Sequence, residues 1–279
     1  FSFSSTSSLA GERLNKDYYF FFTKHLFFTF FAITIMIVIS LVKTELLMKL
    51  TVPLFIVTFF LLAIVPIIGV EVKGAKRWID FYLFRLQPVE ILKPFFILIT
   101  VKILTLEKLK NSQIKYILSF ILLVSVTILL IDQPDLGQSI LIIGSWVATV
   151  FISGVSIVYI LIFFSIFLFS LSSLLFFLPE KFGYITNRLI TFFDPSQGDK
   201  FQSTSALEAI KLGGLTGQGM GEGILKESVP EAHTDYVIAV ISEEYGSLVS
   251  IMILAIFLYI SFRIIKNCFN QDNQYLKIS

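Results

Sequence analysis

Residues 50–70 read LTVPLFIVTFFLLAIVPIIGV, a run without a single charged side chain. A helix needs about 20 such residues to cross roughly 30 Å of hydrocarbon. The rest of the chain has the same character, because 56% of its 279 residues are hydrophobic, 15% are charged and the mean hydropathy is +0.84. That is more apolar surface than a soluble domain can bury. The sequence therefore predicts a membrane protein.

Similar apolar runs recur along the chain, each closed by a turn or a cluster of charges. The predicted membrane-spanning helices cover Leu26 to Val42, Leu50 to Val70, Pro88 to Leu104, Tyr116 to Ile131, Ser139 to Ile152, Val155 to Leu178 and Tyr236 to Phe262. Between the fifth and sixth runs, the polar pair Ser153 and Gly154 marks a hairpin. The predicted fold class is an all-α polytopic membrane protein with about seven transmembrane helices.

The chain is predicted to form a single membrane domain over residues 1–279, with one large loop at 179–235. Loops longer than about 15 residues in compact proteins are usually functional or disordered. If the spans alternate in direction, this loop shares one side of the membrane with residues 1–24, the loop 71–87 and the turn 132–137. Basic residues are similarly frequent on both sides, so the positive-inside rule does not orient the chain. Basic side chains kept on an outer face indicate an anionic ligand.

Several classes of function are excluded by composition. Cys268 is the one cysteine, which rules out an internal disulfide bond, and His25 and His233 are too far apart in sequence for a His/Cys metal site. The net charge of +2 gives no sign of nucleic-acid binding, because basic residues of membrane proteins contact lipid headgroups or anionic ligands. Residues 1–19 lack the apolar core of a signal peptide, and we expect the chain to begin within a longer protein.

Charged residues gather around the start of the third apolar run. Glu90 and Lys93 are three residues apart, so they share one helix face and can neutralise each other in the membrane. In the functional interpretation, Lys93 turns toward an anionic ligand while Glu90 holds it. Lys76 and Arg77 either bind such a ligand or anchor the membrane interface beside the neighbouring tryptophan.

The large loop contains a predicted amphipathic helix that begins at Ser203 or Thr204 and ends at Gly213. Four alternating glycines follow it: Gly217, Gly219, Gly221 and Gly223. Alternating glycines let a ligand approach the backbone closely, which a phosphate-bearing substrate could use. Their spacing matches neither G-x-G-x-x-G nor the P-loop pattern, and a flexible re-entrant turn explains them equally well.

Acidic residues crowd the start of the last apolar run. Asp235 stands at the predicted N-cap position, which alone would explain it. Glu243 lies about 12 Å further along the helix, at a depth where a carboxylate should face a polar cavity or a partner. Capping and function are therefore equally supported for Asp235. Asp132 and Asp135 sit at a helix junction, where capping is the favoured explanation.

The chain carries six motifs in order: GAKRWI at 74–79, QPVEILK at 87–93, QPDLGQS at 133–139, FFDPSQGDKFQ at 192–202, GGLTGQGMGEG at 213–223 and PEAHTDYVIAVISEEYG at 230–246. Together they resemble the SEDS family of bacterial cell-wall proteins, and the division members of that family more than the elongation members. Val89 stands where the family usually has Ser. We also expect the chain to lack the family's first helix and its last two.

The resemblance implies a ten-helix peptidoglycan glycosyltransferase that polymerises lipid II at the outer face of the cytoplasmic membrane, in septal cell-wall synthesis during cell division. Undecaprenyl pyrophosphate is released. The resemblance makes Asp235 the catalytic residue. The expected substrate-binding residues are Lys76, Arg77, Glu90, Lys93, Gly219, Gly221 and His233. The implied partners are a class B penicillin-binding protein transpeptidase and other divisome proteins. No cofactor is evident, although a divalent cation could share the pyrophosphate charge.

Two other functions remain open at this point. In a flippase or transporter for a lipid-linked sugar, Glu90, Lys93 and Glu243 would line a path through the membrane. Such a path needs polar groups at every depth, whereas the charged motifs here gather at one face. A non-catalytic scaffold of the division complex predicts instead that the chemistry of the loops is dispensable.

Overall fold

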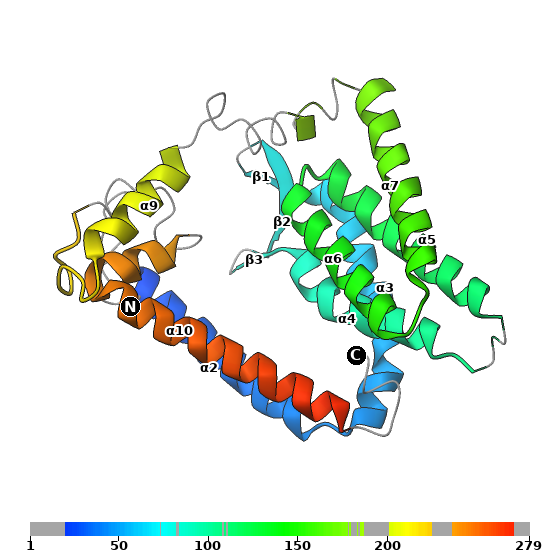
Figure 1. Ribbon diagram of the computed structural model, residues 1–279, viewed down its shortest axis with the longest axis horizontal. Coiled ribbons are helices and arrows are strands. Elements are labelled where there is room, and N and C mark those ends of the chain that lie inside the picture. Colours follow the sequence, from blue (N-terminus) through cyan, green and yellow to red (C-terminus); the bar gives the residue numbers. More distant parts are fainter. Residues whose placement is uncertain are drawn as a thin grey trace. The chain divides into compact units, whose positions relative to one another are not determined.

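The computed structural model describes residues 20–72, 74–81, 84–107, 109, 111–177, 179, 183, 185–186, 201–224 and 236–270. The chain forms two compact units (Figure 1). The first combines Phe1–Val42 with Ile190–Lys266, and the second combines Lys43–Leu189 with Asn267–Ser279.

The second unit is a helical bundle built around α4. Its described helices are α3 (Thr44–Ile68), α4 (Pro88–Leu104), α5 (Ser112–Asp132), α6 (Leu136–Ile152) and α7 (Ile157–Phe177). Helix α4 contacts α3, α5 and α6, and α6 also contacts α7. The apolar runs form helices because every backbone N–H and C=O within lipid must find a partner in its own segment.

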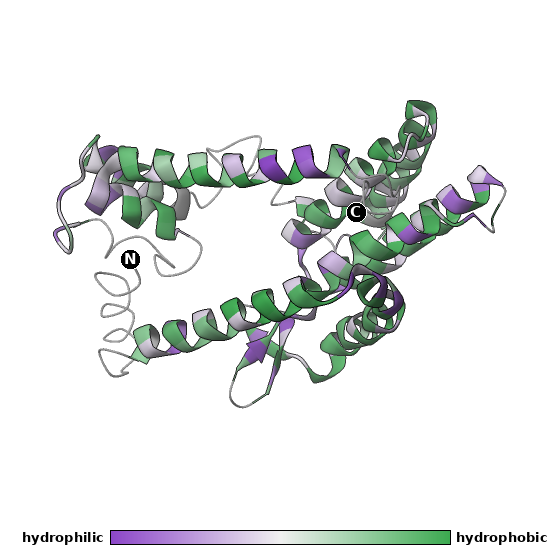
Figure 2. Cartoon of the chain, turned by 90° about the horizontal axis from the view of Figure 1, so that it is seen from below, coloured by the Kyte–Doolittle hydropathy of each residue, from purple (hydrophilic) through white to green (hydrophobic). Residues whose placement is uncertain are grey.

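Large side chains fill the interior of this bundle. Leu62 and Phe96 are fully buried. Phe120 of α5, Trp146 of α6 and Phe163 of α7 form an aromatic cluster with ring centroids 4.6 to 5.9 Å apart. Many other apolar side chains are exposed, and such surfaces fit lipid as the solvent. Figure 2 shows by colour that hydrophobic residues dominate the helices.

A small antiparallel sheet interrupts the helices between α3 and α4. It consists of β1 (Val70–Val72), β2 (Ala75–Asp80) and β3 (Arg85–Leu86), in the order β1-β2-β3. Gly74 has φ of +78° in the turn between β1 and β2, a conformation that glycine adopts without strain. The sequence predicted only a loop over 71–87. The strands are too short and too weakly alternating for the pattern to reveal them.

The first unit contains α2 (Phe20–Leu41), α9 (Phe201–Gly213) and α10 (Val237–Phe269). The span of α2 is apolar and contains no buried residue, as expected of a helix that faces lipid. Helix α9 confirms the amphipathic helix predicted in the large loop, although it begins at Phe201 rather than at Ser203 or Thr204.

Helix α10 is broken at Gly246, where φ is +81° and ψ is 169°. An unbroken helix would bond the Ser247 N–H to the Glu243 carbonyl. Instead, the loop after α9 supplies the partners. Gln218 N donates to Glu243 O at 2.8 Å, and Ser247 N donates to Gly214 O at 2.9 Å. Backbone groups of the loop therefore replace a turn of helical hydrogen bonds.

The next residues repeat this exchange. Gly219 N donates to Glu244 O at 3.0 Å, and Leu248 N donates to Leu215 O at 3.4 Å. Such an exchange requires the two backbones to touch. The glycine-rich loop and the break in α10 are consequently one packed structure.

Helices occur at all seven places that the sequence predicts. Among the described residues, α2, α3, α5, α7 and α10 are long and apolar enough to cross a membrane, whereas α6 is a shorter apolar helix. The predicted polytopic helical membrane protein is confirmed, with the small sheet as an addition to the all-α framework. The number of seven crossings stays a prediction.

Candidate functional site

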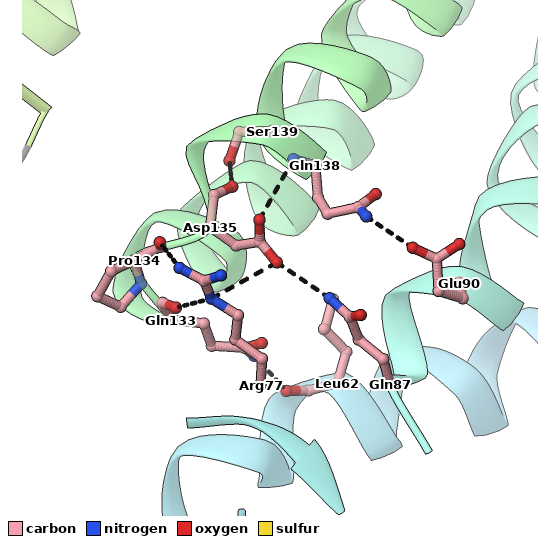
Figure 3. A network of polar contacts seen from close by, with 9 residues as sticks. All are labelled: Leu62, Arg77, Gln87, Glu90, Gln133, Pro134, Asp135, Gln138 and Ser139. Atoms are coloured by element: carbon pink, nitrogen blue, oxygen red, sulfur yellow. Dashed lines mark hydrogen bonds and ion pairs between the residues drawn. The ribbon is translucent and has the colours of Figure 1, made fainter. Parts of the chain in front are cut away.

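The α5–α6 junction is the centre of a polar network at one end of the bundle (Figure 3). Asp135 precedes α6, and its carboxylate accepts a hydrogen bond from the backbone N–H of Gln138 at 3.4 Å. The same carboxylate accepts from Gln87 Nε2 at 3.1 Å and lies 3.8 Å from Arg77 Nε. The predicted cap is confirmed. Asp135 is buried and also joins β2 and the residue before α4 to the junction.

Arg77 extends from β2 to this junction. Its Nε donates to the carbonyl of Gln133 at 3.2 Å, and a terminal nitrogen donates to the carbonyl of Pro134. The Arg77 side chain is only 27% exposed. The guanidinium carries five N–H donors, so it can hold two carbonyls and still present donors to another group. The sequence left open whether Arg77 binds an anion or anchors the interface. The structure places it within a protein network.

Glu90 and Lys93 form the ion pair that their spacing predicts. The two residues lie on α4, with Lys93 Nζ at 2.6 Å from Glu90 Oε2. The other carboxylate oxygen of Glu90 accepts from Gln138 Nε2, also at 2.6 Å. The Lys93 side chain remains 28% exposed, so the ammonium is held in place but still partly open. Its role toward a ligand stays a prediction.

Lys76 has different surroundings from its neighbour Arg77, because successive residues of a strand point to opposite faces. Lys76 is exposed and lines a cavity of about 310 Å³. The other lining residues are Pro66, Glu71, Gly74, Ala75, Asp132, Gln133 and Pro134. Gln133 and Pro134 also hold Arg77, so the cavity adjoins the network.

The predicted catalytic Asp235 and the predicted substrate-binding His233 lie outside the described residues. Of the two glycines expected at the substrate, Gly219 has φ of +116° and donates its N–H to Glu244, while a Cβ at Gly221 would meet open space. At Gly217 the packing of this loop leaves no room for a side chain, since a Cβ there would lie 2.2 Å from Glu244 O. The substrate roles of Gly219 and Gly221 stay predictions.

Glu243 is fully buried in the first unit. The sequence predicted that its carboxylate would face a polar cavity or a partner. The carboxylate packs against the glycine-rich loop, because a Cβ on Gly223 would lie only 3.0 Å from Glu243 Cδ. Glu244 is 2% exposed beside it. The Glu243 carboxylate therefore belongs to the contact between the loop and α10, to which Glu244 contributes its backbone carbonyl.

Three glutamines of the network had no predicted role. Gln87 and Gln138 bind carboxylates, and Gln133 binds a carbonyl of α3. Amide side chains at the ends of membrane helices could have signalled this, because a buried amide requires a partner. Within the described ranges, no cluster of three or more His, Cys, Asp or Glu residues could hold a metal ion. The divalent cation stays a proposal.

Comparisons with known proteins agree with this architecture. A family model described as a cell cycle protein, FtsW/RodA/SpoVE, matches residues 1–278. The probable peptidoglycan glycosyltransferase FtsW of Caulobacter vibrioides is 33% identical over 94% of this chain and 66% of its own length. That of Wigglesworthia glossinidia brevipalpis is 32% identical over 96% of this chain and 72% of its own length. The chain thus spans about two thirds of these relatives.

Solved structures share the fold. A chain of a peptidoglycan synthase complex that coordinates polymerization and crosslinking superposes with a TM-score of 0.68 and 22% identity, over 87% of this chain and 68% of that one. The rod shape determining protein RodA of Thermus thermophilus gives a TM-score of 0.58 and 21% identity, over 87% of this chain and 64% of that one. This protein therefore belongs to the FtsW/RodA/SpoVE family of integral membrane cell cycle proteins.

Proposed function

We propose that this chain is the membrane domain of a peptidoglycan glycosyltransferase that polymerises lipid II during septal cell-wall synthesis. Relatives that bear this description align along 94% and 96% of the chain. The observation that carries the proposal is the network that joins Arg77, Asp135, Glu90 and Lys93 at one end of the bundle. It holds the Arg77 guanidinium on Gln133 and Pro134, which line the same cavity as Lys76, and it holds the Lys93 ammonium on Glu90.

The reaction needs both a base and fixed positive charge. The 4-hydroxyl of the acceptor GlcNAc attacks the anomeric carbon of the donor MurNAc, the bond from that carbon to the lipid pyrophosphate breaks, and the hydroxyl proton passes to the base. We assign the base to Asp235, a role worth about 10² to 10⁴ in rate. Lys76, Arg77 and Lys93 stabilise the negative charge that develops on the departing pyrophosphate. A divalent cation bound with the substrate would share that charge.

The distribution of charge favours polymerisation over transport. In the described parts of α3 to α7, charged side chains lie only in the first or last turns, or within about six residues of a helix end. Thr58 in the middle of α3 and the buried Thr100 of α4 donate to carbonyls of their own helices. A transport path would instead need polar groups through the full depth of the membrane.

The proposed partners follow from the product. A glycan strand becomes cell wall only when a transpeptidase cross-links it, and the structural relative is a complex in which polymerization and crosslinking are coordinated. We therefore propose that this protein acts with a class B penicillin-binding protein and other division proteins at the septum of the cytoplasmic membrane.

The test uses the full-length gene product, purified in complex with its penicillin-binding protein. Wild type and Asp235→Asn are incubated with lipid II, and glycan strands are separated by gel electrophoresis. We expect polymer from wild type and none from the folded variant, because Asn caps a helix nearly as well as Asp but cannot accept the proton. Full activity of Asp235→Asn would overturn the assignment of the base. Absence of polymer from both would overturn the proposed function.

A further inference from the structure

Lys93 is connected to the α5–α6 junction through Gln138. The Lys93 ammonium binds one oxygen of Glu90, and the Gln138 amide binds the other, each at 2.6 Å. Glu90 and Lys93 both belong to α4, whereas Gln138 comes from α6. The ion pair by itself would be mobile, because Glu90 is half exposed and the lysine stem is flexible. The contact from the second helix removes that freedom.

Gln138 is itself well anchored. Its backbone N–H donates to the Asp135 carboxylate, which also binds Gln87 and pairs with Arg77. The amide of Gln138 therefore projects from a helix start that Arg77 of β2 and Gln87 before α4 hold in place. The position of the Glu90 carboxylate, and with it that of Lys93, is set by the junction.

The orientation of the Gln138 amide also indicates that this side chain holds the Glu90 carboxylate in position. Its Oε1 is shielded from solvent and has no hydrogen-bond partner among the described residues. A buried amide oxygen without a partner costs free energy, which a residue needed only to begin a helix would avoid. Turning the amide over would place Oε1 against the Glu90 carboxylate. The side chain is consequently oriented for Glu90.

We propose that Gln138 is a positioning residue of the glycosyltransferase, which fixes Glu90 and thereby aims the Lys93 ammonium at the departing pyrophosphate. This inference rests on the proposed function. Gln138 does not touch the reacting atoms. It acts on the charge that develops in the transition state, so its loss lowers kcat more than it raises KM.

The experiment measures kcat and KM for lipid II polymerisation by the full-length complex. We expect Gln138→Leu to lower kcat about tenfold with KM nearly unchanged, because displacement of a charged group by about 1 Å can cost up to 100-fold. Gln113→Leu is the matched control. Its amide also joins two segments, donating to the Tyr159 hydroxyl at 3.2 Å, but it lies in the first turn of α5, at the far end of that helix from the junction. We expect its kinetics to match wild type.

A double-mutant cycle separates positioning from a general structural effect. In a Glu90→Ala background, Gln138→Leu should cause no further loss, because the group that it positions is gone. Gln138→Asn keeps the amide but is too short to reach Glu90. It should reproduce the loss of kcat, and it replaces the leucine variant if that one fails to fold.

Each other outcome is decisive. Wild-type kcat in folded Gln138→Leu or Gln138→Asn would overturn the inference while leaving the proposed function intact. An equal loss from Gln138→Leu in the presence and absence of Glu90 would also overturn it. No polymer from the wild-type complex would overturn the proposed function and the inference together.

Discussion

The side-chain amide of Gln133 donates a 2.9 Å hydrogen bond to the backbone carbonyl of Leu62. Pro66 lies four residues after Leu62 in α3 and has no N–H, so that carbonyl lacks its helical donor. Gln133 and Leu62 are both buried. An unpaired carbonyl is costly where no water can reach it. Gln133 therefore supplies the hydrogen bond that the Leu62 carbonyl lacks, and it fixes the α5–α6 junction against α3.

Replacing Gln133 by Leu should lower the free energy of unfolding by about 1 to 3 kcal/mol, since it leaves the Leu62 carbonyl unpaired. In a Pro66→Ala background the backbone N–H at position 66 can bond to this carbonyl, and the cost of Gln133→Leu should shrink. Thermal unfolding in detergent of wild type, Gln133→Leu, Pro66→Ala and the double variant measures both costs. Equal costs in the two backgrounds would show that Gln133 acts in another way.

Arg77 should contribute more to stability than Arg85, although both come from the same small sheet. Arg77→Ala removes two hydrogen bonds to carbonyls and a partly buried ion pair, and we expect a loss of about 2 kcal/mol. The pair of Arg85 with Asp80 is exposed, so Arg85→Ala should change stability by less than about 0.5 kcal/mol. Unfolding curves of both variants test this, and similar losses would contradict it.

The contact between the glycine-rich loop and α10 leaves no room for a side chain. A Cβ at Gly217 or Gly246 would lie 2.2 Å from a backbone oxygen, and both residues have positive φ. Gly217→Ala and Gly246→Ala should each destabilise the protein by about 2 kcal/mol or more. Gly144→Ala is the control, because its Cβ meets open space on a helix and should be neutral or stabilising by up to about 1 kcal/mol.

The melting temperature in detergent and the rate of proteolysis report on these glycine variants. If Gly217→Ala unfolds like wild type but fails to polymerise lipid II, the loop serves the substrate rather than the packing of α10.

Lys93 and Lys102 offer a matched pair on one helix. Lys93→Ala should lower the rate of polymerisation by at least about tenfold, because it removes a positive charge proposed to face the pyrophosphate. Lys102 lies in the last turn of α4, where its ammonium donates to the carbonyl of Met48. Lys102→Ala should retain polymerase activity. Lipid II turnover by the two purified variants tests this, and equal activities would remove Lys93 from the mechanism.

The local pattern of the sequence was sufficient to predict the helices and the side-chain contacts between residues of one helix. Apolar runs are visible residue by residue, and the spacing of Glu90 and Lys93 fixed their contact, because residues three apart share a helix face. Similarly, Asp135 was recognised as a cap from its place before an apolar run. Each of these features depends on a few neighbouring residues.

The network around the junction was not predictable in this way. Gln138 and Glu90 are separated by a whole membrane helix and a turn, and Gln133 meets Leu62 from a different part of the chain. A glutamine at a helix end has many possible partners, and only the packing of α3, α4 and α6 selects one. The exchange of backbone hydrogen bonds at Gly246 was likewise not predictable. A glycine indicates that the backbone can adopt unusual conformations, but it does not show which other segment will pack against it.

The sequence by itself determined that this protein lies in a membrane and where its helices run, and it identified the charged residues around the start of α4. These properties follow from transfer of apolar segments into lipid, which each segment undergoes largely on its own. The tertiary structure alone decided which polar groups meet. Polar groups buried in packed protein need partners, so Gln133, Gln138 and the loop beside Gly246 acquire their roles only when distant segments pack together.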